Sequence, residues 1–341
     1  MKILVTGAGS LLLGGVARQL AERGDEVTCF QRRASESTHQ NLSMFKGDIR
    51  DRGAVCEAAR GCDAIIHGAA RVGVVGTWED FHGVNVDGTA NVVRAARENK
   101  ISRLVHVSTP SVAHTGRSIE GAGAEPAVLG RKRSFYAESK ALAEILALEA
   151  NDDSLAVVAL RPHLVWGPGD PQLVGRIIER ARSGRLVMVG RGHALVDSTY
   201  ISNAVDAHVA ALDAVGIGGH CAGKPYVIVN GEPRTVRELM SAICQAAGVE
   251  FAPKHIAPVI ARTTGSVVER IWPLIREGEP PITRFVAEQL GTAHWFDPRP
   301  AQNDLRWTPR VSLDEGFRLL TDWFAASSRE NQRANGTNEQ K

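Results

Sequence analysis

The chain has 341 residues, 43% of them hydrophobic, and a formal net charge of +2. This length allows one large domain or two closely joined ones with ample core. The small net charge and the lack of basic runs or zinc-finger spacing argue against nucleic acid binding, and no segment predicts a membrane span. Five scattered cysteines without metal-ligand or redox-pair spacing predict reduced thiols in a cytoplasmic protein with no metal site.

The first 160 residues alternate short β-branched apolar runs with longer helical patterns. This order is typical of βαβ units and a parallel sheet. Strands are predicted at 2–6, 26–30, 43–46, 64–67, 104–108 and 156–161, and helices at 14–23, 51–59, 87–99 and 136–149. The predicted fold is therefore an α/β doubly wound parallel sheet of the Rossmann type, which binds ligands at the carboxyl ends of its strands.

After residue 162 the pattern is less regular. It predicts a turn at 167–170, a helix at 171–183, a hairpin-like stretch up to Leu195, and helices at 235–247 and 281–290. We therefore expect a dinucleotide-binding domain at 1–162 and a smaller, mainly substrate-binding lobe at 163–324, with some segments returning to the first domain. The polar stretch 325–341 predicts a disordered tail.

A glycine-rich loop joins the first predicted strand to the first predicted helix. Glycines in such a loop let backbone N–H groups approach a pyrophosphate at the positive end of the helix. The residues predicted to contact a cofactor here are Gly7, Gly9, Ser10, Leu11 and Leu12. Ser10 and Leu13 stand where glycine is usual and Gly14 comes one place late, so a turn without a ligand is the alternative.

The second predicted strand ends in Gln31-Arg32-Arg33, where an NAD-binding protein usually carries Asp or Glu. Two guanidinium groups can hold a phosphate bidentately, so the sequence favours NADP (NADPH) over NAD. The alternative is that Arg32 and Arg33 are solvated loop charges. After the third strand, Asp48 either accepts from the adenine amino group or caps the next helix, and Ile49 is a further predicted cofactor contact.

Small residues follow the fourth predicted strand, as a backbone that lies against a cofactor requires. Ala69 and Ala70 are the predicted contacts in this loop. His67, which ends the strand, is predicted to be a satisfied core histidine rather than a catalytic residue.

Tyr136 and Lys140 lie four residues apart on a predicted helix. This step places the phenol and the ammonium on one face, where the cation favours the phenolate and lowers the tyrosine pKa. The pair is a candidate acid/base, and a packed ring beside a solvated amine is the alternative. Ser108, Thr109 and Ser111 end the fifth strand, where a hydroxyl can hydrogen-bond a substrate carbonyl or simply satisfy a turn.

In this order the motifs resemble those of the extended short-chain dehydrogenase/reductase superfamily, in its branch related to 3β-hydroxysteroid dehydrogenases. The resemblance also includes the segments 85–89 and 161–169 and covers about half of the chain. It implies that Tyr136 is the proton donor and that Lys140 holds the nicotinamide ribose. The other implied site residues are Thr109 with Ser108 as the catalytic Ser/Thr, Asn85 as a support of the site or else a capping or turn residue before Asp87, and Pro162.

The segments 108–112, 164–170, 196–201, 230–233 and 280–285 are similar to those of the 2-alkyl-3-oxoalkanoate reductases of bacterial long-chain olefin biosynthesis. This resemblance implies an NADPH-dependent oxidoreductase that reduces the 3-keto group of a long-chain 2-alkyl-3-oxoalkanoic acid to the 3-hydroxy acid. It also implies a possible homodimer and association with other enzymes of the pathway. The alternatives are a 3β-hydroxysteroid or sterol-4-carboxylate 3-dehydrogenase, and a non-catalytic dinucleotide sensor or assembly subunit, which the intact Tyr136 and Lys140 count against.

A substrate with two long alkyl arms needs an apolar channel. The segments 251–260, 267–275 and 285–290 offer apolar side chains for it, although the helical stripe at 267–275 also fits plain core, a partner interface or a membrane-surface contact. The basic segment 116–133 fits a flap whose Arg131, Lys132 or Arg133 meets the substrate carboxylate, or else a solvated loop.

Overall fold

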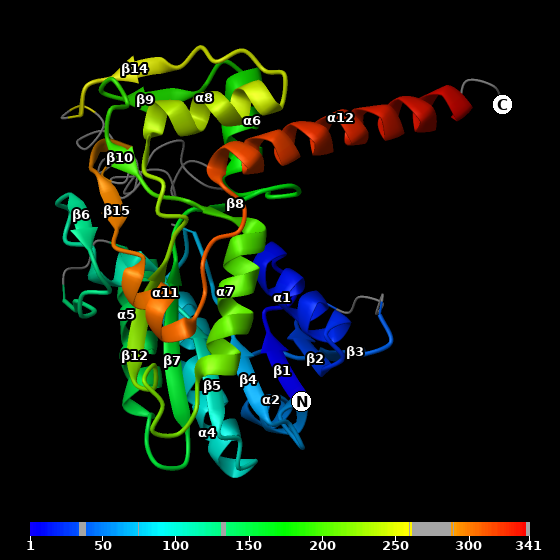
Figure 1. The fold of residues 1–341 in the computed structure, drawn as a ribbon, viewed down its shortest axis with the longest axis vertical. Helices are drawn as coiled ribbons and strands as arrows, with labels where there is room; N and C mark the ends of the chain where they lie inside the picture. The colour runs from blue at the N-terminus through cyan, green and yellow to red at the C-terminus, as the bar shows by residue number, and fades with distance from the viewer. Residues whose placement is uncertain are drawn as a thin grey trace.

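The computed structural model describes residues 1–33, 39–73, 75–130, 134–258, 260, 288 and 290–338, with side chains up to residue 329. A seven-stranded parallel sheet forms the body of the molecule (Figure 1). Its strands in spatial order are β12 (Lys224–Ile228), β7 (Ala156–Pro162), β5 (Arg103–Val107), β4 (Ala64–His67), β1 (Lys2–Thr6), β2 (Glu26–Gln31) and β3 (Leu42–Lys46). The doubly wound sheet is confirmed, and the six predicted strands match to within one residue at either end. The strand order reverses between β1 and β4, where such sheets bind their ligands.

Helices cover both faces of this sheet. Successive side chains of a strand point to opposite faces, so Ile3 and Val5 join one core and Leu4 joins the other. The first core is covered by α1 (Leu11–Glu22), α7 (Ile201–Ala214) and α11 (Arg299–Leu305). The second is covered by α2 (Arg52–Ala58), α4 (Gly88–Glu98) and α5 (Phe135–Glu149).

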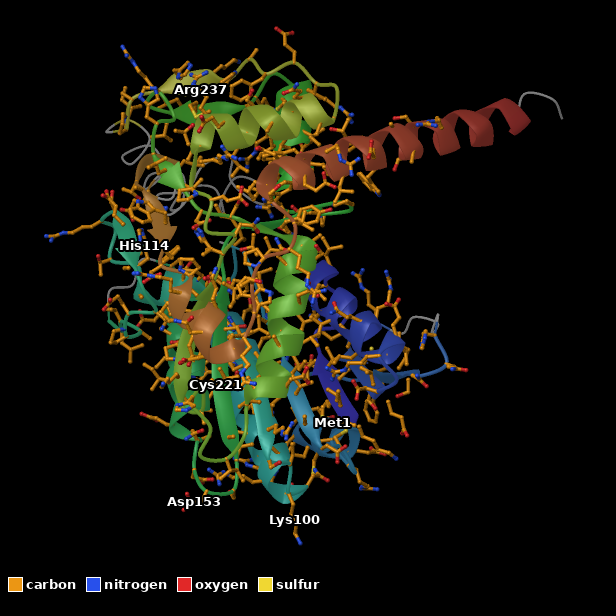
Figure 2. All side chains as sticks on the ribbon, viewed as in Figure 1. Met1, Lys100, His114, Asp153, Cys221 and Arg237 are labelled. Carbon is orange, nitrogen blue, oxygen red and sulfur yellow. The ribbon has the colours of Figure 1, made fainter. Side chains whose placement is uncertain are left out.

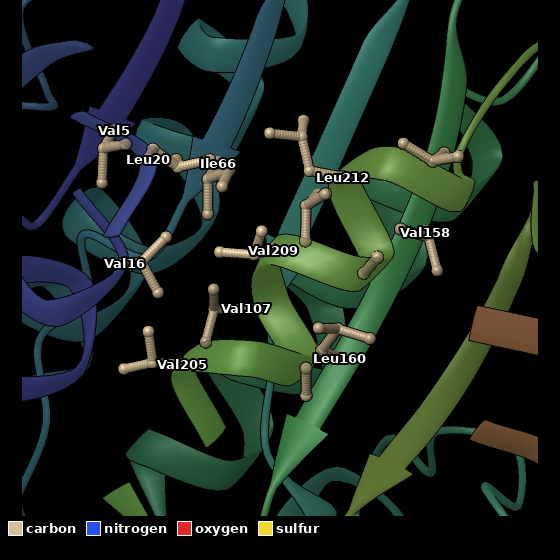
Figure 3. Close-up of a cluster of buried hydrophobic side chains, with 14 of the residues drawn as sticks. Val5, Val16, Leu20, Ile66, Val107, Val158, Leu160, Val205, Val209 and Leu212 are labelled. Atoms are coloured by element: carbon tan, nitrogen blue, oxygen red, sulfur yellow. The ribbon is translucent and has the colours of Figure 1, made fainter. Parts of the chain in front are cut away.

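Helix α7 and strand β12 come from the second half of the chain but belong to the first sheet. Figure 3 shows Val205, Val209 and Leu212 of α7 packed over the sheet, with Val209 beside Val107 of β5. The sequence patterns did not predict either element. Strand β12 lies at the edge of the sheet, where its proline can be tolerated because an edge strand has fewer ladder hydrogen bonds to lose.

The second lobe contains short strands in three small sheets. They are β13 (Arg234–Thr235), β10 (Leu195–Val196), β15 (His294–Phe296) and β6 (Ile119–Ala122) in one sheet, β9 (Val187–Val189) with β14 (Lys254–Ile256), and β8 (Val165–Trp166) with β11 (Thr199–Tyr200). Helices α6 (Val174–Arg182), α8 (Val236–Ala246) and the start of α12 (Leu313–Asn338) pack around Trp166 and Tyr200. The predicted hairpin up to Leu195 is wrong, because β9 and β10 pair with distant strands rather than with each other.

Helix α12 extends away from the body of the molecule (Figure 1). The sequence predicts a disordered tail from residue 325, and this prediction is wrong for residues 325–338, which continue the helix. Leu313 and Leu320 are buried in the second lobe and anchor the first turns. Once those turns are formed, each further residue adds a hydrogen bond without a new nucleation cost, and Ala325, Ala326 and Arg329 are good helix formers.

Three predictions lie outside the described residues: the helix at 281–290 apart from Glu288 and Leu290, the apolar stripe at 267–275, and the basic side chains of 131–133. Among the helices that the structure describes, none has the length and apolar content needed to cross a membrane. All five cysteines carry free thiols, as their scattered spacing predicts.

Asp197 lies at the junction between the second lobe and the sheet. Its side chain is fully buried, and its Oδ1 accepts hydrogen bonds from the backbone N–H groups of Ser198 at 3.1 Å and Gly231 at 3.2 Å. Within the described part of the chain its Oδ2 has no hydrogen-bond partner. Burial raises the pKa of Asp197 to about 7, although the backbone donors act in the opposite direction.

We therefore expect the stability difference between the Asp197→Asn variant and the wild type to depend on pH. The Asp197 carboxyl has a pKa of about 7 in the folded state and about 3.8 in the unfolded state, so the folded state holds its proton more tightly. The stabilisation from this proton is therefore complete below about pH 3.8 and is lost as the pH rises towards about 7. An amide has no such proton to lose. The free energy of unfolding of the variant, relative to that of the wild type, should increase by about 3 kcal/mol from about pH 5 to about pH 8. Urea unfolding of both proteins across this range measures the difference, and a constant difference would contradict the assignment.

Candidate active site

A cavity of about 790 Å³ runs past the carboxyl ends of the central strands. It brings together nine of the predicted cofactor contacts: Gly7, Gly9, Ser10, Arg32, Arg33, Asp48, Ile49, Ala69 and Ala70. The predicted catalytic residue Thr109 does not line it, and neither do the seven other predicted cofactor contacts: Leu11, Leu12, Asn85, Ser108, Tyr136, Lys140 and Pro162. The sequence missed Arg18, Arg71 and Val72, which also form its wall. Arg71 directly follows the predicted small-residue loop, and extending that loop by one residue finds it.

The glycine loop forms one end of this cavity. Gly7 has a φ of +80°, and a β-carbon there would lie 2.8 Å from the backbone nitrogen of Ala69, so only glycine fits. The Ser10 hydroxyl caps α1 by accepting a hydrogen bond from the Leu13 N–H at 3.2 Å. This cap explains why α1 begins at Leu11, earlier than predicted. Leu13 is buried against Gly68 and does not crowd the cavity.

Asp48 carries a negative charge on the cavity wall. The residue that caps α2 is Asp51, so the capping alternative for Asp48 is wrong. The Arg50 guanidinium instead donates to both Asp48 oxygens, at 3.0 Å and 2.7 Å. These hydrogen bonds, helped by the charge of Arg32, lower the pKa of Asp48 to about 2. Asp48 is therefore ionised at neutral pH and can accept hydrogen bonds.

Tyr136 and Lys140 lie one turn apart at the start of α5, whose N-terminus is capped by Ser134. Tyr136 is half-buried and its hydroxyl is hydrogen-bonded to Thr109. Burial raises the pKa of Tyr136, and the bond with Thr109 opposes this shift. The sequence predicts a pKa lowered by Lys140, and that prediction is wrong for this arrangement. Lys140 donates to the carbonyl oxygen of Val107 at 2.6 Å, and burial lowers the Lys140 pKa to about 8.

The three hydroxyls after β5 have different surroundings. Thr109 contacts Tyr136, and it also donates to the Ser111 hydroxyl at 3.3 Å while it caps the short 3₁₀ helix Pro110–Ala113. The Ser108 hydroxyl is buried without a hydrogen-bond partner in the residues described. A buried hydroxyl without a partner is rare in a folded chain and fits a position that meets a bound molecule. Among the three, Thr109 is the residue that the fold pairs with the phenol.

Asn85 connects the helix of Tyr136 to the wall of the cavity. It is buried in the π-helix η1 (Gly83–Asp87), a distortion that is frequent at functional sites. Its amide donates to the Ser139 hydroxyl at 2.9 Å and to the Arg71 carbonyl at 3.2 Å, and its oxygen accepts from the Arg71 N–H at 2.7 Å. Asn85 therefore holds α5 in place and does not cap α4.

His67 is the core residue that the sequence predicts. Its ring is buried between the hydroxyls of Thr6 at 2.7 Å and Thr89 at 3.0 Å. Because Thr89 donates its own proton to the Asn85 carbonyl at 2.6 Å, it accepts from His67, which assigns the His67 proton to Nε2. Burial lowers the pKa of His67 to about 3, so the ring is neutral.

Residues 4–257 match the 3-beta hydroxysteroid dehydrogenase/isomerase family. The chain belongs to this family. The family consists of oxidoreductases of the extended short-chain dehydrogenase/reductase type. A 2-alkyl-3-oxoalkanoate reductase of Stenotrophomonas maltophilia is 48% identical over 330 residues, which cover 96% of this chain and 100% of that protein. A protein of the same name from Shewanella oneidensis is 40% identical over 93% of this chain and 84% of its own length.

A solved structure shows the same architecture as this chain. A UDP-glucuronic acid 4-epimerase from Bacillus cereus, in complex with UDP-glucuronic acid and NAD, aligns with a TM-score of 0.73 over 96% of this chain and 99% of that chain. The two sequences are 20% identical, so this likeness shows the fold alone. It confirms the predicted Rossmann sheet with an added C-terminal lobe.

Proposed function

We propose that this protein is a 2-alkyl-3-oxoalkanoate reductase that uses NADPH to reduce the 3-keto group of a long-chain 2-alkyl-3-oxoalkanoic acid to a 3-hydroxy group. The observation that carries the proposal is the Tyr136–Thr109 pair. Tyr136 lies one helical turn from Lys140, and Thr109 follows β5, whose sheet neighbour β4 leads into the cavity wall at Gly68. The two relatives of this name, which align over nearly the whole chain, support the substrate class.

The cavity fits a nicotinamide dinucleotide. Gly7 leaves only backbone at its wall, and α1 begins beside it, so the helix N-terminus can stabilise a pyrophosphate. Asp48 offers an acceptor on the same wall, and Arg32 and Arg33 offer cations. A reduced dinucleotide bound in this cavity supplies a hydride to a carbonyl carbon.

Tyr136 acts as the proton donor to the substrate oxygen. Its raised pKa keeps the phenol protonated at neutral pH, which is the state that a donor requires. Thr109 fixes the phenol, and its hydroxyl can donate a second hydrogen bond to the same oxygen once it rotates away from Ser111. The Lys140 ammonium, held by the Val107 carbonyl, places a positive charge near the phenolate that forms when the proton leaves.

The preference for NADPH depends on Arg32 and Arg33. Both side chains are exposed on the cavity wall, where guanidinium groups can hold a 2′-phosphate in charge-assisted hydrogen bonds. We expect the Arg32→Ala/Arg33→Ala variant to raise KM for NADPH about tenfold or more and to leave KM for NADH unchanged, since such bonds contribute about 1.5–3 kcal/mol each. Steady-state kinetics with both nucleotides measures this. An Arg185→Ala variant, which removes an exposed arginine of the second lobe, is the matched control, and equal losses with NADPH and NADH would contradict the assignment.

Assays on purified protein test the substrate class. The family description also covers 3-beta hydroxysteroids, so a 3β-hydroxysterol and its 4-carboxylate are assayed beside the 2-alkyl-3-oxo acid. Because 3-oxo acids decarboxylate readily, the reverse reaction with a 2-alkyl-3-hydroxy acid and NADP⁺ provides a stable second assay. Turnover of the sterols alone would overturn the proposal. Homodimer formation and association with other enzymes of the pathway are further predictions, which sedimentation analysis tests.

A further inference from the structure

Four exposed apolar side chains lie in the first turn of α5 and in two loops that hydrogen bonds connect to this helix. Of the ten large apolar side chains that the described residues expose most strongly, four lie here: Val72 at 60%, Val75 at 37%, Leu129 at 43% and Phe135 at 46%. We call these four residues the entrance patch. Contiguous exposed apolar surface on a soluble protein is costly, and it commonly marks a binding site.

Ring contacts and hydrogen bonds hold the entrance patch together. The Phe135 ring packs on Trp78 of α3 (Trp78–His82), with ring centroids 5.9 Å apart. The Arg71 guanidinium stacks over Phe81 at 5.2 Å and donates to the Val75 carbonyl at 3.2 Å, which fixes the loop that carries Val72 and Val75.

The segment of Leu129 is tied to the same helix. The Gly130 N–H donates to the Glu138 carboxylate at 2.7 Å, and Glu138 lies in the first turn of α5. Leu129, the residue before this tether, is therefore held beside the end of α5 that carries Phe135. The patch is built from three separate segments of the chain that meet at one helix end.

The entrance patch is continuous with the candidate active site at two points. Val72 belongs both to the patch and to the wall of the 790 Å³ cavity. Phe135 and Tyr136 both lie in the first turn of α5, so the patch reaches the turn that carries the phenol, although neighbouring side chains on a helix do not face each other. An apolar chain that leaves a keto group hydrogen-bonded to Tyr136 therefore meets apolar side chains as it passes out of the site.

We infer that the entrance patch binds one alkyl arm of the substrate and contributes to selection for long chains. This inference rests on the proposed function, since it assigns a part of the same substrate to a part of the same site. Alkyl chains suit this surface because its four defining side chains are apolar and bring no charge that an alkyl arm would have to desolvate. Each methylene group that leaves water for such a surface adds to affinity, so binding should increase with chain length.

The test uses the Val75→Ser/Leu129→Ser variant and a series of 2-alkyl-3-hydroxy acids of graded chain length with NADP⁺. Both side chains are exposed, so the substitutions should leave folding intact. We expect KM for the longest acids to rise about tenfold and KM for the shortest acids to stay unchanged. Ile217→Ser, which removes another exposed apolar side chain, at 52% exposure after α7, is the matched control and should change neither KM. A chain-length profile equal to that of the wild type would overturn the inference.

Calorimetric titration with the same acids separates this inference from the proposed function. Affinity that increases with chain length in the wild type but not in the double variant supports the role of the entrance patch, even if no turnover is seen. An absence of turnover would then count against the proposed function alone. Equal binding by both proteins overturns the patch. A variant that changes only the sedimentation coefficient assigns the surface to a subunit interface and overturns the inference as well.

Discussion

Replacing Tyr136 with Phe is expected to lower turnover by about a hundredfold or more and to leave NADPH binding nearly unchanged, in line with typical general-acid contributions. The substitution removes the hydroxyl that bonds to Thr109 and keeps the half-buried ring. Because Tyr136 does not line the 790 Å³ cavity in which we propose that the dinucleotide binds, the affinity for the dinucleotide should depend little on it. Initial rates of NADPH consumption measure turnover, and fluorescence titration measures binding.

A second tyrosine provides the control for this variant. The Tyr226 hydroxyl donates a hydrogen bond to Asp304 at 2.5 Å. Tyr226 belongs to the edge strand β12, which β7, β5 and β4 separate from β1 and its glycine loop. Tyr226→Phe also deletes one hydrogen-bonded hydroxyl and should retain turnover. If Tyr136→Phe retains turnover as well, the proton-donor role is ruled out.

Replacing Glu144 with Gln is expected to lower the free energy of unfolding by about 3–5 kcal/mol, because it leaves a buried arginine without its counter-charge. Arg161 and Glu144 are both about fully buried, at 1% exposure each. The guanidinium donates to the two carboxylate oxygens at 2.8 Å and 2.5 Å, and its third bond goes to the Glu125 carbonyl at 2.6 Å. Urea unfolding at neutral pH measures the loss.

An exposed pair on α12 serves as the matched control. Arg318 donates to both carboxylate oxygens of Glu315 at 2.8 Å and 2.6 Å, and both side chains face water. Glu315→Gln should change stability little, because exposed ion pairs are screened by solvent. An Arg161→Met/Glu144→Leu variant should recover much of the loss, since well-packed apolar replacements remove both buried charges. Equal stabilities of Glu144→Gln and Glu315→Gln would show that burial of the pair is unimportant.

Local signals predicted the site residues with uneven success. Gly7, which the sequence predicts as a cofactor contact, lies on the cavity wall, because a strand, a glycine and a helix in sequence specify that turn by themselves. The role of Asp48 stayed open between a helix cap and a hydrogen-bond acceptor on the cavity wall, because it depended on whether Asp51 would cap α2 instead. Leu13 stands where glycine is usual, and only the packing of Leu13 against Gly68, from another strand end, shows that its side chain stays out of the cavity.

The sequence by itself determined the alternation of strands and helices up to residue 162, the position of the glycine loop, and the placement of Tyr136 and Lys140 on one face of a helix. These features depend on residues a few positions apart, and strand alternation and helical periodicity record them directly. Only the tertiary structure decided that β12 joins the sheet beside β7, that Thr109 meets the phenol, and that the pKa of Tyr136 is raised. Those outcomes depend on pairing and burial between segments that are distant in the chain, and residue spacing carries no measure of either.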